Sequence, residues 1–323
     1  MERPMSYIIT GASGFVGGHL IEQILRNDPE AFITCLDLVE PDYFFLDEKM
    51  RSSVNFIKAD LLSASELVKT LESAHPRFIV HLASFSSVAY SWQHPIESFM
   101  NNSNIFLNLL EAVRSVDPHI RVLSVGSSEQ YGIVSPEMLP LKETSPQNPV
   151  SPYAVARVAQ EHMGSVFAKG FMLDIVTTRS FNHFGPRQNE KFVLSGFARQ
   201  AAEIKKGKRD PVIYAGDLGI IRDFIDVRDV VKAYLLLLNN GMSGEVYNVC
   251  SGTGRTVMEC LKTLILIADI KCEIKKSDAL VRPVDNPLIV GDNGKLMALT
   301  GWSPEIPFES GLTDLFEYWM AKL

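Results

Sequence analysis

Tyr153 and Arg157 are the two residues whose types and spacing most suggest chemistry in this chain. They lie four positions apart in the segment Ser-Pro-Tyr-Ala-Val-Ala-Arg that begins at Ser151. On a helix this spacing puts both side chains on one face, one turn apart. An adjacent positive charge favours the phenolate form of a tyrosine, and carbonyl–alcohol redox chemistry needs a group that gives or takes a proton. The pair predicts an acid–base site, although a Tyr and an Arg at this spacing are more often ordinary surface residues.

A glycine-rich segment near the N-terminus predicts a dinucleotide-binding turn. Residues 10–17, Thr-Gly-Ala-Ser-Gly-Phe-Val-Gly, follow an apolar strand-like run and open an apolar-periodic helix, which is the context that such a pattern requires. The glycines allow a tight turn, a close approach to a pyrophosphate and close helix–strand packing, and the helix N-terminus then faces the phosphates. A turn without a nucleotide is the alternative. The cofactor contacts expected here are Gly11, Ser13, Gly14, Phe15, Val16 and Gly17.

Three further strand ends are expected to line the cofactor groove. Asp37 ends the second predicted strand, where an acid accepts hydrogen bonds from ribose hydroxyls and repels a 2′-phosphate. We therefore expect NAD, with NADP disfavoured by Asp37. Asp60 and Leu61 follow the third strand as adenine-side candidates, although Asp60 could instead cap a helix. The backbone after the fourth strand supplies Leu82, Ala83 and Ser84.

The elements that must position these residues alternate along the first half of the chain. Continuous apolar strands alternating with helices predict a parallel sheet covered on both faces. We predict an α/β fold, a Rossmann-like doubly wound parallel sheet with a smaller C-terminal substrate-binding lobe. The Rossmann domain is expected at 1–179 plus about 226–249, and the lobe at about 180–225 plus 250–323. The expected strands are 7–10, 32–37, 54–59, 78–82, 121–125, 174–178 and 245–249, with helices near 15–25, 64–71, 95–116, 153–167 and 230–238.

Composition excludes several classes of function. The chain has 323 residues, of which 46% are hydrophobic and 21% charged, and a net charge of −7. This charge argues against nucleic-acid binding and against attraction to anionic membranes. Without a signal peptide or a long apolar stretch, a cytoplasmic location is expected. The four cysteines and seven histidines show no metal-ligand spacing, so we expect reduced thiols and no metal.

Five motifs, taken together and in order, resemble the extended short-chain dehydrogenase/reductases that modify nucleotide sugars, the NAD-dependent epimerase/dehydratase family. Residues 180–188, 246–252 and 300–304 are most similar to GDP-sugar members, namely GDP-4-keto-6-deoxy-D-mannose reductases and GDP-mannose 4,6-dehydratases. The five motifs are Gly11–Gly17, His81-Leu82-Ala83, the run Gly126–Gly132 (Gly-Ser-Ser-Glu-Gln-Tyr-Gly), Ser151-Pro152-Tyr153 and the run Arg222–Asp229 (Arg-Asp-Phe-Ile-Asp-Val-Arg-Asp).

The resemblance implies a role for each matched residue. Tyr153 matches the catalytic tyrosine and Ser127 the serine that hydrogen-bonds the reacting oxygen, while Arg157 stands where the family has lysine. Arg keeps the charge and the donors but not the geometry of Lys. Glu129 lies where dehydratases keep the base that takes the C5 proton. Asn102 matches a structural or proton-relay asparagine near the cofactor, and the implied sugar-nucleotide contacts are Ser127, Ser128, Glu129, Asn182, Arg187, Val193, Arg222 and Arg282.

The implied function is C4-keto reduction of a GDP-4-keto-6-deoxyhexose to a GDP-D-rhamnose-type product, with Tyr153 as proton donor. Three alternatives stay open: a GDP-mannose 4,6-dehydratase, a C4 epimerase or dehydrogenase that recycles bound NAD, and a non-catalytic protein that binds NAD or a nucleotide sugar. Asp37 fits enzymes that hold and recycle NAD. A GDP-sugar is the expected partner. The helix from Pro95 and the Tyr153 helix match the pair that this family uses to form a homodimer.

Overall fold

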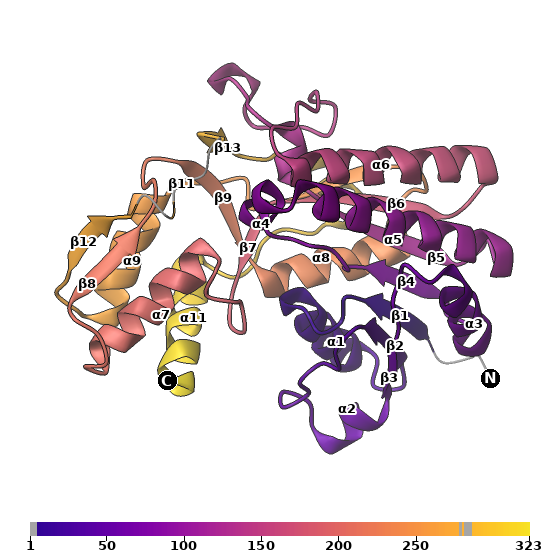
Figure 1. The fold of residues 1–323 in the computed structure, drawn as a ribbon, viewed down its shortest axis with the longest axis horizontal. Coiled ribbons are helices and arrows are strands. Elements are labelled where there is room, and N and C mark those ends of the chain that lie inside the picture. Colours follow the sequence, from indigo (N-terminus) through magenta and orange to yellow (C-terminus); the bar gives the residue numbers. More distant parts are fainter. Residues whose placement is uncertain (1–4, 278–279, 281–285) are drawn as a thin grey trace.

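The main sheet is parallel throughout, as the alternation of elements predicts. In the computed structural model, which describes residues 5–277, 280 and 286–323, seven strands lie in the order β10-β6-β5-β4-β1-β2-β3 (Figure 1). β2 and β3 lie on one side of β1, and β4 lies on the other side. At such a reversal of strand order a crevice forms at the carboxyl ends of the two central strands, here β1 and β4. The strands are β1 (Ser6–Thr10), β2 (Phe32–Asp37), β3 (Val54–Lys58), β4 (Phe78–His81), β5 (Arg121–Ser127), β6 (Ile175–Ser180) and β10 (Val246–Val249).

Helices cover both faces of this sheet, which confirms the doubly wound prediction. Successive strand residues point to opposite faces, so Ile9 packs with Leu20 and Tyr234 on one face while Ile8 packs with Phe106 and Phe167 on the other. The first face carries α1 (Phe15–Asn27) and α8 (Val227–Asn240), and the second carries α3 (Ala64–Ala74), α5 (Pro95–Val116) and α6 (Pro152–Phe171).

A smaller lobe follows β6 and has its own apolar core. Its strands pair in two small sheets, β11-β9-β13 with β7 beside β9, and β12-β8. The lobe strands are β7 (Asn182–Phe184), β8 (Val212–Ala215), β9 (Ile221–Asp226), β11 (Gly254–Thr256), β12 (Glu273–Lys276) and β13 (Leu288–Ile289), and its helices are α7 (Val193–Lys205), α9 (Val257–Ala268) and α11 (Phe308–Lys322).

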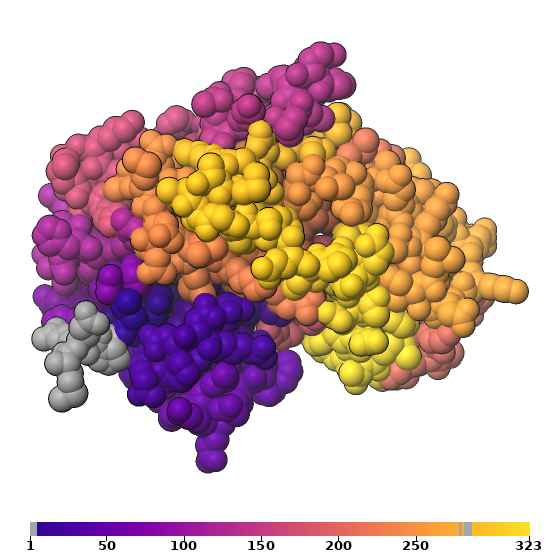
Figure 2. All heavy atoms as spheres, turned by 180° about the vertical axis from the view of Figure 1, so that it is seen from behind, coloured from indigo at the N-terminus to yellow at the C-terminus, as the bar shows by residue number. Residues whose placement is uncertain are grey.

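The C-terminal part of the chain crosses between the two halves. Leu296 and Trp302 fall in the range that the sequence assigned to the lobe, yet they pack in the Rossmann core. From behind, this yellow segment runs over the orange α8 region before it enters the lobe as α11 (Figure 2). The remaining short elements are α2 (Glu48–Ser52), α4 (Val88–Gln93), α10 (Gly294–Thr300), and the 3₁₀ turns η1 (Ser128–Tyr131) and η2 (Pro136–Met138).

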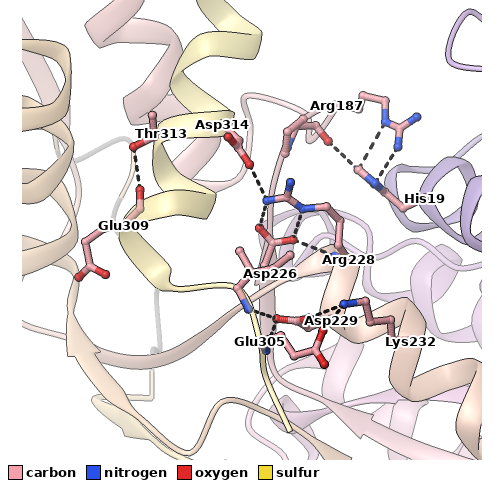
Figure 3. Close-up of polar contacts among 12 residues, drawn as sticks. His19, Arg187, Asp226, Arg228, Asp229, Lys232, Glu305, Glu309, Thr313 and Asp314 are labelled. Carbon is pink, nitrogen blue, oxygen red and sulfur yellow. Dashed lines mark hydrogen bonds and ion pairs between the residues drawn. The ribbon is translucent and has the colours of Figure 1, made fainter. Parts of the chain in front are cut away.

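Two aspartates of the Arg222–Asp229 run join β9 of the lobe, α8, α11 and the crossing segment (Figure 3). Asp226 caps α8 and pairs with Arg228, which also pairs with Asp314 of α11 at 2.7 Å. This cap explains why α8 begins at 227 rather than near 230. Asp229 accepts hydrogen bonds from the N–H groups of Glu305 and Ile306 at 3.0 and 2.8 Å. Both contacts fix the lobe to the Rossmann half.

None of the helices in the described residues is long and apolar enough to cross a membrane.

Candidate active site

Ser127 lies at the carboxyl end of β5, where the strand turns into η1. Its Oγ accepts a hydrogen bond from the N–H of Glu129 at 3.2 Å, so its own proton is available to another acceptor. Its backbone N–H donates to Oε1 of Gln130 at 3.0 Å, and this reciprocal capping box fixes the turn. Ser128 is buried and Glu129 half-buried in the same turn.

A buried ion pair holds this turn against α6 and β6. Glu161 accepts two hydrogen bonds from Arg179, at 2.9 and 2.7 Å, and one from Nε2 of Gln130 at 2.7 Å. Burial alone would lower the pKa of Arg179, but the hydrogen bonds and charge of Glu161 outweigh burial and raise it. The orientation of the Ser127 backbone therefore depends on a charge pair that is itself buried.

Helix α6 delivers Tyr153 and Arg157 to the same edge of the sheet. Ser151 caps the helix by accepting the N–H of Ala154 at 3.1 Å, and Pro152 occupies its first turn, where a missing N–H costs nothing. Both Tyr153 and Arg157 are buried, and the Arg157 guanidinium carbon lies 5.2 Å from the centre of the Tyr153 ring. Because α6 packs against β5 and η1, the structure brings Ser127, Tyr153 and Arg157 to one region.

The glycine turn approaches the end of β4 as closely as the chain allows. Gly11 has φ +70°, and a Cβ there would lie 2.6 Å from the amide nitrogen of Ala83. A Cβ on Gly17 would lie 2.3 Å from the carbonyl oxygen of Ala12. Both positions require glycine. Phe15 and Val16 open α1, and Gly14 is its N-cap residue.

The predicted adenosine-side residues gather at the ends of β2 and β3. The Asp37 carboxylate accepts hydrogen bonds from the N–H and Oγ of Ser13 at 2.9 and 2.6 Å, which attaches the glycine turn to β2. Asp60 follows β3 and accepts the N–H of Leu62 at 2.9 Å, while Leu61 is buried. Asp37 therefore contacts the glycine turn directly, whereas the side-chain hydrogen bond of Asp60 within the described residues is local, to the N–H of Leu62 in its own loop.

Asn102 has a backbone-clamping role in the segment after β4. Its Oδ1 accepts the N–H of Phe85 at 2.8 Å, and its Nδ2 donates to the carbonyl of Phe85 at 3.3 Å. Asn102 therefore fixes the backbone at Phe85, directly after the segment from Leu82 to Ser84. Among the described residues, Ser84 Oγ is buried and has no hydrogen-bond partner.

The predicted sugar-nucleotide residues spread over several lobe elements. Asn182 lies on β7, Val193 begins α7, and Arg222 is buried on β9 in register with Arg255. Arg282 lies outside the described residues. The structure therefore brings Asn182 and Arg222 onto paired neighbouring strands.

Arg187 makes its contacts with the Rossmann half. Its Nη2 donates to Nδ1 of His19 at 2.6 Å (Figure 3). The same nitrogen pairs with Glu22 at 3.0 Å, and the guanidinium lies over the ring of Phe45. Burial and then the charge of Arg187 lower the pKa of His19 to about 3, so this histidine is neutral and can accept the bond. In this structure Arg187 joins the β7–α7 connection to α1.

Several residues of this site were missed by sequence reasoning. Gln130 was readable in principle, because Ser127 and Gln130 match a capping-box pattern. Gln160, Glu161 and Arg179 offered no local signal, since their partners lie on other elements. His81 belongs to one of the sequence motifs, but its role was not predicted. Nδ1 of its buried ring forms a hydrogen bond with Oγ1 of Thr10 at 2.9 Å.

The arrangement fits a dinucleotide with a nicotinamide end near Arg157. The cradle at Gly11 admits no side chain, and a helix N-terminus follows it. Arg157 Nε and Ser84 Oγ are buried polar atoms without partners in the described part of the chain, and buried donors of this kind call for a ligand. No group of His, Cys, Asp or Glu side chains in the described residues could hold a metal.

We predict that His81 makes the protein less stable in acid. Burial and then the charge of Arg157 lower the pKa of His81 to about 3, whereas an unfolded histidine titrates near 6.5. Its contribution to stability is therefore complete above about pH 6.5 and is lost as the pH falls toward 3, by about 2 kcal/mol at pH 5. The free energy of unfolding, measured with urea at pH 7.5 and at pH 5, should fall less between these pH values for His81→Gln than for wild type.

The exposed His119 supplies the control. For His119→Gln, the free energy of unfolding should fall between pH 7.5 and pH 5 by the same amount as in wild type. An equal fall in wild type and His81→Gln would contradict the prediction.

Comparison with known proteins agrees with this geometry. The profile of a family described as GDP-mannose 4,6 dehydratase matches residues 8–315. GDP-6-deoxy-D-mannose reductase from Pseudomonas aeruginosa is 32% identical over 319 residues, which cover 98% of this chain and 97% of the relative.

Two solved structures share the fold. The structure of RMD from Pseudomonas aeruginosa complexed with NADPH has a TM-score of 0.86 and 31% identity, covering 99% of this chain and 100% of that chain. The UDP-glucose 4-epimerase of Thermus thermophilus in complex with NAD has a TM-score of 0.86 and 30% identity, with coverage of 99% and 100%. The chain therefore belongs to the GDP-mannose 4,6-dehydratase family and is an NAD(P)-dependent nucleotide-sugar enzyme of the extended short-chain dehydrogenase/reductase type.

Proposed function

We propose that this enzyme reduces the C4 keto group of a GDP-4-keto-6-deoxyhexose to give a GDP-D-rhamnose-type product. The observation that carries the proposal is the meeting of Ser127, Tyr153 and Arg157 at one edge of the sheet, beside a turn built for a dinucleotide. The similarity to a GDP-6-deoxy-D-mannose reductase over 98% of the chain supports the substrate class.

The roles of the three residues follow from their contacts. A bound nicotinamide cofactor supplies the hydride. Tyr153 gives its phenolic proton to the sugar oxygen as the C4 carbonyl becomes an alcohol, and Ser127 donates its free hydroxyl proton as a hydrogen bond to the same oxygen. The Arg157 cation beside the phenol stabilises the phenolate left behind. Proton and hydride together balance the reduction.

Cofactor and substrate are proposed to use separate sets of residues. Gly11, Ser13, Gly14, Phe15, Val16, Gly17, Asp37, Asp60, Leu61, Leu82, Ala83, Ser84 and Asn102 form the cofactor set, with Tyr153 and Arg157. Ser127, Ser128, Glu129, Asn182, Val193, Arg222 and Arg282 form the sugar-nucleotide set. An Arg is suited to this task because its fork donates to two phosphate oxygens at once. Arg187 is part of this set as well, because its Nη1 is buried and has no hydrogen-bond partner among the described residues.

A 4,6-dehydratase is the second candidate, and Glu129 is the observation that favours it. Its backbone N–H donates to Ser127 Oγ, so the carboxylate belongs to the same turn as the proposed hydroxyl donor. A dehydratase would oxidise C4, remove the C5 proton with Glu129, lose water from C6 and return the hydride to C6. Its net consumption of cofactor would be zero.

Product analysis separates the two reactions. The enzyme should consume one NADH for each GDP-4-keto-6-deoxymannose and leave GDP-mannose unchanged. Tyr153→Phe removes the proton donor and should lower kcat by about 10²–10⁴-fold while NADH still binds.

The exposed Tyr214 of β8 gives the matched control, since Tyr214→Phe should keep wild-type turnover. Conversion of GDP-mannose without added reductant would overturn the reductase proposal. Undiminished turnover in Tyr153→Phe would overturn the assigned proton donor.

We further propose that Asp37 selects NADH over NADPH. A carboxylate at the end of β2 repels a 2′-phosphate, and its contact with Ser13 holds it beside the turn. Asp37→Ser should raise the NADPH-to-NADH ratio of kcat/KM by about tenfold, equivalent to about 1.4 kcal/mol. Steady-state kinetics with both cofactors measure this ratio, and Asp42→Ser, an exposed acid nearby, should not change it. A wild-type enzyme that prefers NADPH would refute the proposal.

A homodimer through α5 and α6 completes the proposed function. Val155 and Val166 of α6 and Met100 of α5 are 43%, 61% and 50% exposed, which leaves apolar surface on the helix pair that the family resemblance implicates. Val166→Glu should shift the mass in sedimentation equilibrium from dimer toward monomer, because a carboxylate opposes burial. Leu266→Glu, on α9 of the lobe, should not shift the mass. A monomeric wild type would exclude this interface.

A further inference from the structure

Arg157 is held by a buried neighbour on its own helix. Its Nη1 donates to Oε1 of Gln160 at 2.6 Å and to the carbonyl oxygen of Val125 at 3.0 Å. Gln160 is 1% exposed and Arg157 is 4% exposed. Both protons of Nη1 are therefore committed to acceptors that water does not reach.

The other end of the Gln160 amide is tied to β5. Its Nε2 donates to Oγ of Ser124 at 2.8 Å and more weakly to Val125 at 3.3 Å. The amide orientation follows from chemistry, because a guanidinium only donates and must face the amide oxygen. The Ser124–Gln160–Arg157 chain thus runs from the sheet to the guanidinium.

The remaining donors of the guanidinium have no protein partner within the described residues. Nε of Arg157 is buried without a hydrogen-bond acceptor in that part of the chain, and Nη2 likewise has none among residues 5–277, 280 and 286–323. An arginine presents its N–H donors in a rigid planar fork. Fixing Nη1 therefore also fixes the direction of the donors that remain.

We propose that Gln160 is a positioning residue for Arg157: it fixes Nη1 so that the Nε and Nη2 edge is kept for the vicinal hydroxyls of the nicotinamide ribose. The inference rests on the proposed function in that it takes this ribose as the ligand of Arg157. Two parallel N–H donors match a diol, whereas a lysine ammonium is a freely rotating point donor. Gln160 is therefore required because residue 157 is an arginine.

A double-mutant cycle tests this dependence. Gln160→Met keeps the length of the side chain and removes the acceptor. It should raise the Kd of NADH by about tenfold and lower kcat, while the KM for the keto sugar stays within about twofold. In the Arg157→Lys background the same change should alter the Kd of NADH by less than about twofold, because Lys has no planar edge to orient.

Equal effects of Gln160→Met in the two backgrounds would overturn the proposal and leave Gln160 with a packing role. Gln200→Met in the lobe is the matched control and should leave the Kd at its wild-type value. If Gln160→Met does not fold, Ser124→Ala removes the acceptor of Nε2 and should raise the Kd by about threefold only when residue 157 is Arg. No rise with Arg157 present, or equal rises in both backgrounds, would likewise overturn it.

NADH binding is measured without sugar, by quenching of protein fluorescence. The cycle therefore reports on Gln160 even if the wild-type enzyme does not reduce the keto sugar. Failure of the proposed function appears in the product analysis of the wild type alone.

Discussion

The buried carboxylate of Glu161 is the contact on which the site geometry depends. It accepts hydrogen bonds from Arg179, which donates twice, and from Gln130 and Gln147. Removing one partner of such a pair leaves an uncompensated buried charge, which costs about 3–5 kcal/mol. Since Gln130 also accepts the backbone N–H of Ser127, the same carboxylate joins α6 to β6 and to the turn after β5.

Local patterns in the sequence were enough to predict the sheet and the glycine turn. Strand alternation depends on neighbouring residues, and the turn needs glycine for reasons visible in its backbone. The contacts of Gln160 with Ser124 and of Gln130 with Glu161 join residues 36 and 31 positions apart. These pairs form only when β5, β6 and α6 lie side by side, so no spacing of residues in the sequence predicts them.

Arg187 is a second residue whose contacts could not be predicted from the sequence. The motif resemblance predicts a substrate contact for it, but no motif predicts the contacts of its guanidinium with His19 and Glu22 of α1. The left-handed backbone at Arg187, with φ 75°, turns the connection after β7 toward the Rossmann half. A motif identifies which residue types recur, but the direction of a side chain depends on backbone conformation that the motif does not encode.

The crossing of the C-terminal segment has a consequence for synthesis of the chain. Leu296 and Trp302 belong to the core beneath α1 and α8, and Asp229 binds the backbone of residues 305 and 306. A nascent chain leaves the ribosome from its N-terminus, and its domains usually fold in that order. Here the nucleotide-binding half stays incomplete until residues 296–306 have emerged, so its final packing waits for a segment that is made after most of the lobe.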